Sequence, residues 1–347
     1  MTREVEIRFV LVRDGADFAP LYALSDSAPM LQMSDGGDIK TSLRGEFAIP
    51  ENVNWLSDQI RAELWIDGTR HNLGLYLPAT VQASRNETSR SVQVEAYDRG
   101  WLVRDTYTEE RLYFPAGTNY LSAVQQLLIG AGISLAAVIP TTATLPEARE
   151  DWDIGTSYLT IINQLLSEIN YNALWFNGNG IAILEPASVP AARNIDHTLD
   201  SEDIRSLMLP TMDEQTDIYS APNVFICVCS NPDKDDAMTA TAVNDNPQSP
   251  LSTVRRGRRI CRLETVDNIA SQEELQAYAN RLCNESLITG ETITVQTALL
   301  PGYGVADVTA LHYEEFAGIC IERGWTMELR TGGNMTHQLE KVVVNLE

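Results

Sequence analysis

The chain has little positive charge. It carries 25 lysines and arginines against 48 aspartates and glutamates, a formal net charge of −23. The acidic excess is spread along the chain, because residues 1–105, 106–210 and 211–347 carry −5, −8 and −10. Such a surface repels phosphate, which argues against duplex nucleic acid as a bound partner. It suits a soluble protein, or a wall past which a polyanion moves without sticking.

Cysteine is also scarce. The five cysteines have an odd count and scattered spacing, which fits neither a disulfide framework nor a zinc pattern. Cys227 and Cys229 lie in a strand-like run, so we expect them to share one face as buried, reduced thiols. Asp233, Asp235 and Asp236 resemble the start of a calcium loop, but its glycine and closing glutamate are missing. We therefore predict no metal and no cofactor.

Long hydrophobic runs are missing. The longest run, residues 127–140, covers about 14 positions, whereas a membrane-spanning helix needs about 20. The amino terminus has acidic residues where a signal peptide would have basic and then apolar ones. We predict no membrane-spanning segment and no signal peptide.

Catalytic motifs are missing too. The sequence has no Gly-x-Ser-x-Gly elbow, no phosphate-binding loop and no His-Glu-x-x-His motif. Adjacent carboxylates such as Glu109 and Glu110 would point to opposite faces of a strand. Nothing in the sequence therefore selects an acid–base pair, and we predict no catalytic residues.

Twelve residues near the middle of the chain occur twice. Residues 117–128 (GTNYLSAVQQLL) and 155–166 (GTSYLTIINQLL) share Gly-Thr, Tyr-Leu, Gln and Leu-Leu at a spacing of 38 positions. Each copy predicts a helix with apolar residues at helical spacing, capped by the hydroxyl of Thr118 or Thr156. A short apolar run follows each copy, which indicates two helix–strand units. A local duplication and convergence on one capping chemistry are alternative explanations.

Both flanks of this centre are predicted to be rich in strands. Asp67-Gly68 separates two strand-like runs and favours a type I′ hairpin turn. Asn177–Gly180 is a second hairpin signal. Residues 33–52 are rich in Gly, Ser and charge and are predicted to form a long loop. One clear helix in the last third begins with the capping box Ser271–Glu274.

One cluster opposes the overall charge. Four arginines surround Gly257, namely Arg255, Arg256, Arg258 and Arg259. The alternatives are a nucleic-acid patch, a solvated turn and an interface with carboxylates of a neighbouring subunit. The surrounding acid weighs against the first alternative. Arginine suits ion pairs at interfaces, so these four residues are the interface candidates.

The order of these features resembles a known protein family. The likeness rests on VQVEAYDRGWLVRDT (92–106), GTNYLSAVQQLL, DWDIGTSYLTIINQLLSEINYNALWFNGNGIAILEP (151–186), APNVFICVC, SQEELQAYANRL and LLPGYGVADVTAL. In this order they resemble the baseplate or tail hub proteins of bacteriophages and phage-like particles. The resemblance covers nearly the whole chain, although no single motif is specific.

The resemblance implies a mainly β fold class with an α/β insertion. It implies two tail-tube-like β-barrel domains per chain, the first at residues 1–104 with a return segment at 197–220 and the second at 221–347. A small helix–strand insertion domain would occupy 105–196. Three chains would form a pseudo-six-fold ring that joins the tail tube to the spike or tail tip and surrounds the DNA-ejection channel.

The resemblance also implies partners. These are other copies of the chain in a homotrimer, the tail tube or distal tail protein, the spike or tail-tip protein and, as a further candidate, the tape-measure protein. DNA would pass only transiently, and the protein would be a virion tail component assembled in the host bacterial cytoplasm. Two other classes stay open, a tail-associated cell-wall hydrolase and a carbohydrate- or receptor-binding tail module. The binding module would expose tryptophans, but the six tryptophans lie mostly in apolar runs and are predicted to be core.

Overall fold

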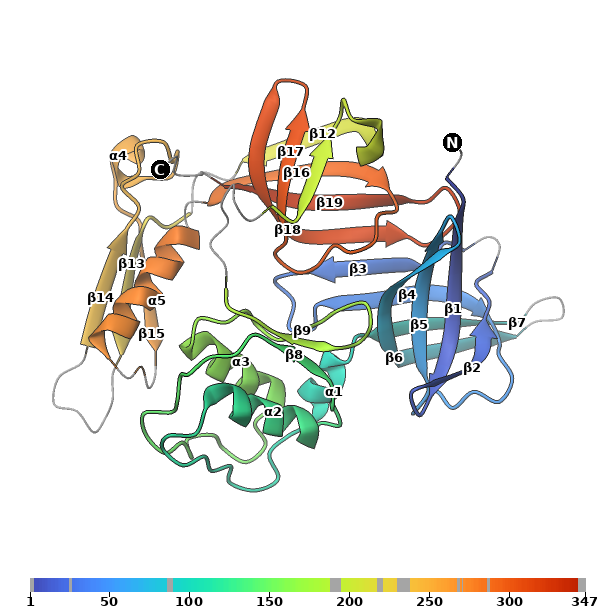
Figure 1. Ribbon diagram of the computed structural model, residues 1–347, viewed down its shortest axis with the longest axis horizontal. Coiled ribbons are helices and arrows are strands. Elements are labelled where there is room, and N and C mark those ends of the chain that lie inside the picture. Colours follow the sequence, from blue (N-terminus) through green and yellow to red (C-terminus); the bar gives the residue numbers. More distant parts are fainter. Residues whose placement is uncertain are drawn as a thin grey trace. The chain divides into compact units, whose positions relative to one another are not determined.

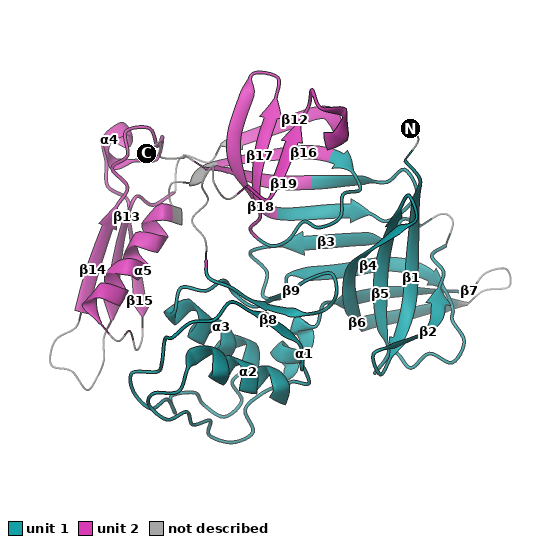
Figure 2. Ribbon diagram, in the orientation of Figure 1, with its two compact units in different colours: residues 1–186, 297–305, 324–336 teal, residues 187–296, 306–323, 337–347 magenta. Residues whose placement is uncertain are grey.

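The protein is mainly β, with 47% strand and 16% helix, as predicted. The computed structural model describes residues 3–24, 27–85, 90–187, 195–216, 221–229, 238–266, 269, 271–285 and 288–342. The chain divides into two compact units, coloured separately in Figure 2. Unit 1 comprises residues 1–186, 297–305 and 324–336, and unit 2 comprises residues 187–296, 306–323 and 337–347.

The large sheet of unit 1 is antiparallel. Its strands follow the order β18-β3-β4-β7-β6-β5-β1-β2 (Figure 1). Their bounds are β1 Val5–Arg13, β2 Ala16–Leu21, β3 Met30–Ser34, β4 Thr41–Ala48, β5 Gln59–Ile66, β6 Thr69–Arg85, β7 Arg90–Tyr97 and β18 Phe316–Glu328, of which residues 324–328 belong to unit 1. Alternating apolar side chains form its core, where the rings of Phe9 and Phe47 lie edge to face with centroids 5.1 Å apart.

Two predictions for this sheet have opposite outcomes. Asp67-Gly68 joins β5 to β6 with φ angles of 48° and 78°, as a type I′ turn requires. The predicted loop at residues 33–52 is wrong, because β4 lies inside it and pairs with β3 and β7. Leu43 and Phe47 of β4 are fully buried, and polar residues alternate with them. Glycine and charge masked this two-residue period in the sequence.

The central part of unit 1 combines helices with a small sheet. The elements are α1 Gly100–Asp105, α2 Tyr120–Gly130, β8 Ala136–Val138, α3 Tyr158–Glu168, β9 Trp175–Phe176 and β10 Ala182–Leu184. Strand β10 pairs in parallel with β8 and antiparallel with β9. The chain turns from β9 to β10 at Asn177–Gly180, so this hairpin lies where the sequence predicts it. Each of the two predicted helices is followed by a strand, as expected.

The two threonines do not cap these helices, and that prediction is wrong. Asn119 caps α2, because its side chain accepts hydrogen bonds from the backbone N–H groups of Leu121 and Ser122 at 3.0 and 3.2 Å. The hydroxyls of Thr118 and Thr156 instead donate to the carbonyl oxygen three residues earlier, each at 2.7 Å. Each threonine lies one residue before the cap, where it contacts the preceding turn.

The strands of unit 2 form two groups. The larger group follows the order β12-β16-β19-β18, and β17 pairs with both β18 and β11. The bounds are β11 His197–Asp200, β12 Met208–Thr216, β16 Ile288–Ala298, β17 Val308–Tyr313 and β19 Asn334–Val342, with a 3₁₀ turn at Ile204–Ser206. Among the described residues, no pairing of the first strand with the last one closes either group of strands into a barrel. Closure into barrels and the predicted domain boundaries therefore stay predictions.

A smaller sheet of unit 2, in the order β14-β13-β15, packs against α5 (Figure 1). The bounds are β13 Val224–Cys229, β14 Met238–Val243, α4 Thr253–Arg256, β15 Cys261–Val266 and α5 Gln272–Glu285. The N–H of Glu274 donates to Ser271 Oγ at 3.2 Å, so α5 begins at the predicted box. Cys227 and Cys229 are buried together under α5, as predicted, whereas Cys261 on the edge strand is exposed.

Candidate functional site

The four candidate arginines lie in one turn of unit 2. Arg255 and Arg256 end α4, and Arg258 and Arg259 follow before β15. Three of them are exposed, whereas Arg256 is half-buried and its Nη1 donates to the carbonyl oxygen of Ala221 at 2.6 Å. The turn therefore presents three guanidinium groups and bonds the fourth to the backbone of the segment before β13. Its role as an interface stays a prediction.

A buried asparagine fixes this arginine turn. Asn223 has no exposed surface, and its Nδ2 donates to the carbonyl oxygens of Leu251 and Arg258 at 3.0 and 3.1 Å. Its Oδ1 accepts from the N–H of Ile260 at 2.8 Å. Ser252, also fully buried, caps α4 through its hydroxyl oxygen. Buried polar groups thus hold the backbone that displays the arginines, and Asn223 could not be found from the sequence because its partners are far away in the chain.

Asp98 anchors the passage from the large sheet of unit 1 to the central helices. Its carboxylate is buried, and Oδ2 accepts from the backbone N–H and the hydroxyl of Thr41 at 2.7 and 2.9 Å. Oδ1 accepts from the N–H of Gly100 at 2.8 Å. Burial raises the pKa of Asp98, although these hydrogen bonds act to lower it. A Cβ at Gly100 would lie 2.8 Å from Oδ1, so this joint requires glycine.

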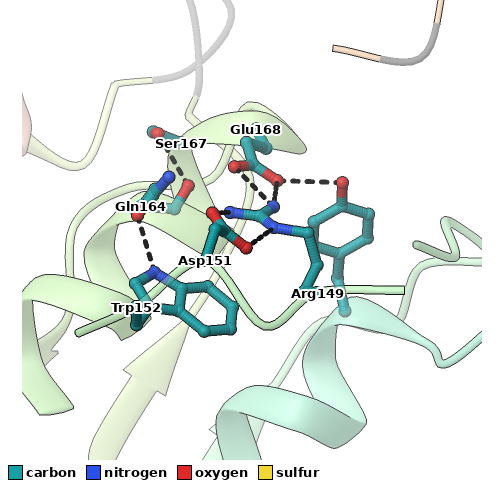
Figure 3. Close-up of polar contacts among 7 residues, drawn as sticks. Arg149, Asp151, Trp152, Gln164, Ser167 and Glu168 are labelled. Atoms are coloured by element: carbon teal, nitrogen blue, oxygen red, sulfur yellow. Dashed lines mark hydrogen bonds and ion pairs between the residues drawn. The ribbon is translucent and has the colours of Figure 1, made fainter. Parts of the chain in front are cut away.

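A second buried charge network lies in the central part of unit 1 (Figure 3). Arg149 is 3% exposed, and its Nε and Nη2 donate to the Asp151 carboxylate at 2.7 and 2.9 Å. Nη1 donates to Oε1 and Oε2 of Glu168 at 2.9 and 2.8 Å, and Oε2 also accepts from the Tyr120 hydroxyl at 3.0 Å. The Trp152 ring lies 4.7 Å from Cζ of Arg149. Every guanidinium nitrogen is bonded to a carboxylate, so the network ties its loop to α2 and α3.

Burial and pairing compete in this network. Burial raises the pKa of Glu168. Burial acts to raise the pKa of Asp151, but the hydrogen bonds from Arg149, the charge of Arg149 and backbone hydrogen bonds together outweigh it and lower that pKa. The network was missed from the sequence because Arg149 and Glu168 belong to different elements. The only local signal was the Arg-x-Asp spacing within the stretch that carries the family resemblance.

Comparison with known proteins identifies solved structures that share this architecture. No protein-family model matches the sequence, and no curated protein matches it either. Solved structures do match along the whole chain. A tail protein from Neisseria meningitidis MC58 has a TM-score of 0.67 at 14% identity and covers 96% of both chains. The 43 kDa tail protein of prophage MuSo2 from Shewanella oneidensis has a TM-score of 0.67 at 10% identity, covering 96% of this chain and 98% of that one.

This chain has the fold of phage tail proteins. A third structure extends the likeness, a component of the E. coli type VI secretion system that is described as structurally similar to the T4 bacteriophage tail proteins gp27 and gp5. Its TM-score is 0.55 at 10% identity, over 96% of this chain and 77% of that one. The predicted resemblance to tail proteins is thus confirmed at the level of the fold.

In this tail-protein fold, the carboxyl groups with raised pKa values serve the structure. Asp98, Glu168 and Glu322 are buried, and burial is the main cause of each raised pKa. Glu322 Oε2 lies 2.8 Å from Nδ1 of His337, and neither side chain has exposed surface. Because these groups bond to protein neighbours away from solvent, they are poorly placed to reach a substrate.

Two more histidines pair with carboxylates in unit 2. His197 lies 2.8 Å from Asp307, and His312 lies 3.1 Å from Asp200. Among the described residues, no group of three or more potential ligands is arranged to hold a metal ion. Asp233, Asp235 and Asp236, the incomplete start of a calcium loop, lie outside the described residues. Nor does any helix in the described part of the tail-fold chain have the length and apolar character needed to cross a membrane.

The tryptophans of the tail fold are less buried than predicted. Trp152 and Trp325 are core residues at 5% exposure, but the other four are half-buried, namely Trp55, Trp65, Trp101 and Trp175. Arginines cover two of these rings, because Cζ of Arg8 lies 4.2 Å from the Trp65 centroid and Cζ of Arg104 lies 3.8 Å from that of Trp101. Stacking by long charged side chains lets these rings stay near the surface.

Proposed function

We propose that this protein is a structural hub of a phage or phage-like tail baseplate. The observation that carries the proposal is the match to tail proteins over 96% of this chain and at least 96% of each of two solved tail proteins. Three copies form a pseudo-six-fold ring, which joins the tail tube to the spike or tail tip and surrounds the ejection channel. The β-rich composition of both units supports this role, because two tube-like parts per chain supply six in a trimer.

The proposed domains are those that the family resemblance implies. Residues 1–104 with 197–220 form the first tube-like barrel, 105–196 form the insertion and 221–347 form the second barrel. Along the ring axis, the tail tube or distal tail protein contacts one face of the ring, and the spike or tail-tip protein contacts the other. Similarity of the E. coli relative to both gp27 and gp5, two tail proteins, supports a position in the tail.

The assembly itself provides the first test. Single-particle averaging of the native tail, or its native mass after gentle dissociation, should find three copies of the chain around one axis. Isolated protein is a poor substitute, because ring contacts can depend on the neighbouring tail proteins. A single copy of the chain in an otherwise intact particle would contradict the hub proposal.

We also propose that the arginine turn forms a contact off the ring axis. Its support is the rigid backbone that displays Arg255, Arg258 and Arg259 on a chain of net charge −23. Changing all four arginines to serine should impair assembly. A matched control changes Arg8, Arg205, Arg262 and Arg330 to serine, because each of these pairs with a carboxylate on its own chain. Equal assembly defects in both quadruple variants would argue for a loss of charge alone.

The proposed channel wall is the polar face of β4, β7 and β6. A depression of about 550 Å³ on this face is lined by Glu46, Gln82, Gln93 and Glu95, with Arg44 bonded to Glu95 at 2.6 Å. A wall with few free cations releases a moving DNA strand easily. Glu46→Lys with Gln93→Lys should leave assembly nearly intact but slow genome release, most strongly at low salt where screening is weak. Unchanged release at low salt would contradict this assignment.

The hub is proposed to work without a catalytic centre. Purified protein incubated with peptidoglycan, nucleotides or ester substrates should turn over none of them. The support is the structural use of the perturbed carboxyl groups, which are bonded inside the protein. Activity that disappeared on changing one carboxylate or cysteine would instead favour the tail-associated hydrolase.

A further inference from the structure

One face of the small sheet in unit 2 lies away from helix α5 (Figure 1). On the side that α5 covers, Phe225, Cys227 and Cys229 are buried. Side chains alternate along a strand, so their neighbours in sequence point to the opposite side. We call that side the uncharged face, and the pairing register arranges it in three rows: Val224, Val243 and Cys261; Ile226, Thr241 and Leu263; Val228, Thr239 and Thr265.

The uncharged face is largely exposed, although none of its nine side chains carries a charge. Leu263 is 67% exposed, and Cys261 on the same strand is exposed too. The polar face of β4, β7 and β6 in unit 1 differs, because it carries Arg44, Glu46 and Glu95. Exposed patches of low polarity with a charged border mark protein contacts. The composition of the uncharged face therefore indicates a surface that another protein covers.

The arginine turn borders one end of the uncharged face. It precedes β15, which begins at Cys261, and Asn223, which fixes the turn, is followed directly by Val224. Arg255 and Arg259 are exposed, and within the described residues neither forms an ion pair. A complementary partner must therefore combine hydrophobic side chains with carboxylates that are not already paired.

Unit 1 presents a surface of that chemistry beside the start of α3. Ile154 and Tyr107 are large hydrophobic side chains, yet they are 67% and 51% exposed. Three exposed carboxylates flank them, and none of the three forms an ion pair in the part of the chain that the structure describes. We call this surface the acidic knob, and it consists of Tyr107, Glu109, Glu110, Asp153 and Ile154.

A buried threonine fixes the acidic knob, as Asn223 fixes the arginine turn. Thr108 is 4% exposed, and its hydroxyl donates to the carbonyl oxygen of Asp153 at 2.9 Å and accepts from the N–H of Thr156 at 3.1 Å. Its backbone N–H donates to Thr156 at 3.0 Å, and its carbonyl oxygen accepts from Gly155 at 2.8 Å. Surfaces that are rigid before they meet lose little conformational entropy on binding.

We propose that the uncharged face and the arginine turn of one copy bind the acidic knob of the next copy in the ring. Ile154 contacts the row that contains Leu263, while Arg255 and Arg259 pair with the carboxylates of the knob. Contacts in a closed ring are heterologous, so two different surfaces of one chain must be complementary. Unpaired cations beside one hydrophobic surface and unpaired carboxylates beside the other select these two. The choice of a second copy as the partner rests on the proposed function.

Cross-linking in assembled tails tests the contact. The chain carries Ile154→Cys and Leu263→Cys in a Cys261→Ser background, which removes the exposed native thiol, and a short bismaleimide joins the new thiols. Denaturing gels should show covalent dimers and trimers, whereas Leu263→Cys alone should give neither.

The matched control for the cross-link replaces Ile154→Cys by Ile139→Cys. Ile139 is 51% exposed, and its carbonyl oxygen accepts from the hydroxyl of Tyr171, which follows the other end of α3. Its pair with Leu263→Cys should yield little product. Equal yields from the two pairs, or a product only within single chains, would overturn the proposal.

Exchange of charge tests the ionic part of the contact. Arg255→Glu with Arg259→Glu should lower incorporation into tails at least about tenfold in competition with the wild type, because like charges then face each other. Adding Glu109→Lys and Asp153→Lys to the same chain should recover most of that loss. Failure of this second pair to recover incorporation would contradict the assigned carboxylates.

A control separates the contact from net charge. Glu4→Lys with Glu315→Lys changes two exposed carboxylates outside the knob and adds the same charge, so it should recover nothing. Equal recovery by both lysine pairs would overturn the contact. The copy number in the same tails distinguishes the two proposals. Three copies without the cross-linked product would overturn this contact and leave the hub, whereas a single copy would overturn both.

Discussion

The two helical copies in unit 1 share a backbone but differ in their side-chain support. Before each helix, the N–H of Gly117 or Gly155 donates to a carbonyl oxygen of another segment at 2.8 Å. After each helix comes a residue of left-handed conformation, Gly132 with φ 79° and Asn170 with φ 57°. These two residues are 38 positions apart, as are the two glycines. The repeat therefore extends beyond the twelve similar residues into both helix ends.

The contact between the helices is reciprocal but chemically unequal. Tyr120, which begins α2, donates to Glu168, which ends α3. Tyr158, which begins α3, lies against Gly130, which ends α2, since a Cβ there would be 3.1 Å from its ring. Only Glu168 brings a charge into the contact, and Arg149 pairs with it. The shared backbone determines where the two helices meet. Gly130 and Glu168 occupy equivalent positions, so this one difference in sequence places a buried charge at the end of α3 and none at the end of α2.

Removing Arg149, the partner of the buried Glu168 carboxylate, should change the stability of this region most. Arg149→Met leaves Glu168 buried without a counter-charge and should cost about 3–5 kcal/mol of unfolding free energy in urea titrations. Adding Glu168→Gln should recover part of the loss. The control is Arg205→Met, whose ion pair with Asp203 lies at the surface with the arginine side chain 88% exposed, so its loss should stay below about 1 kcal/mol. Equal losses would contradict a special role for the network.

The helix caps should differ by a smaller amount. The Asn119 side chain accepts two backbone N–H bonds and also donates to the carbonyl oxygens of Thr141 and Ala143 at 2.8 and 3.0 Å. Ser157 caps α3 without accepting such a bond, and its hydroxyl donates to Arg104 at 2.7 Å. Asn119→Ala should therefore cost about 2 kcal/mol and Ser157→Ala about 0.5–1 kcal/mol. Thermal unfolding measures both, and the reverse order would show that the caps are equivalent or misassigned.

The paired tyrosines probe the reciprocal contact directly. Tyr120→Phe removes a hydrogen bond to a buried carboxylate and should cost about 1–1.5 kcal/mol. Tyr158→Phe keeps the ring against Gly130 and should cost less than about 0.5 kcal/mol. Urea midpoints of the two variants provide the measurement. Similar losses would mean that the Tyr158 hydroxyl has an equally important partner.

The smallest expected effect depends on pH. Arg149 lowers the pKa of Asp151 although burial opposes it, so the folded protein favours the ionised carboxylate. This stabilisation is complete above the unfolded pKa of about 4 and is lost as pH falls through the lower folded pKa. Between about pH 5 and 3, the unfolding free energy of Asp151→Asn should fall less than that of the wild type. The difference should stay below ~1 kcal/mol, because the Asp151 side chain is 42% exposed. When Arg149 is already changed to Met, adding Asp151→Asn should leave the pH dependence of the unfolding free energy unaltered.

Local sequence signals predicted those features whose cause is local. The Asp67-Gly68 turn depends on two adjacent residues that tolerate positive φ, and α5 begins where Ser271 caps it. The two central helices followed from apolar spacing. The order of such features along the chain also sufficed for the tail-protein fold, because that order reflects the architecture even where no single motif is specific.

The failed predictions depended on context beyond a few residues. Strand β4 was hidden because Gly45 and its charged neighbours have low strand propensity, while pairing with β3 and β7 overrides propensity. Thr118 was one position away from the cap that it was expected to form. The partners of Arg149 and of Asn223 lie in other elements, and no periodicity of a single segment marks them. The net negative charge of the chain predicted solubility, but it could not predict any individual ion pair.

The pairing of β3 with β18 has a consequence for how the chain folds. Ser34 pairs with Gly324, so 290 positions separate two neighbours in one sheet. At a synthesis rate of about 5–20 residues per second, β3 waits roughly 15–60 s for its partner to be made. During that time its outer edge offers unpaired backbone groups to any other extended chain. Nascent chains on the same messenger RNA are therefore exposed to mispairing until β18 has been synthesised, and slow translation of residues 35–323 should lower the yield of soluble protein.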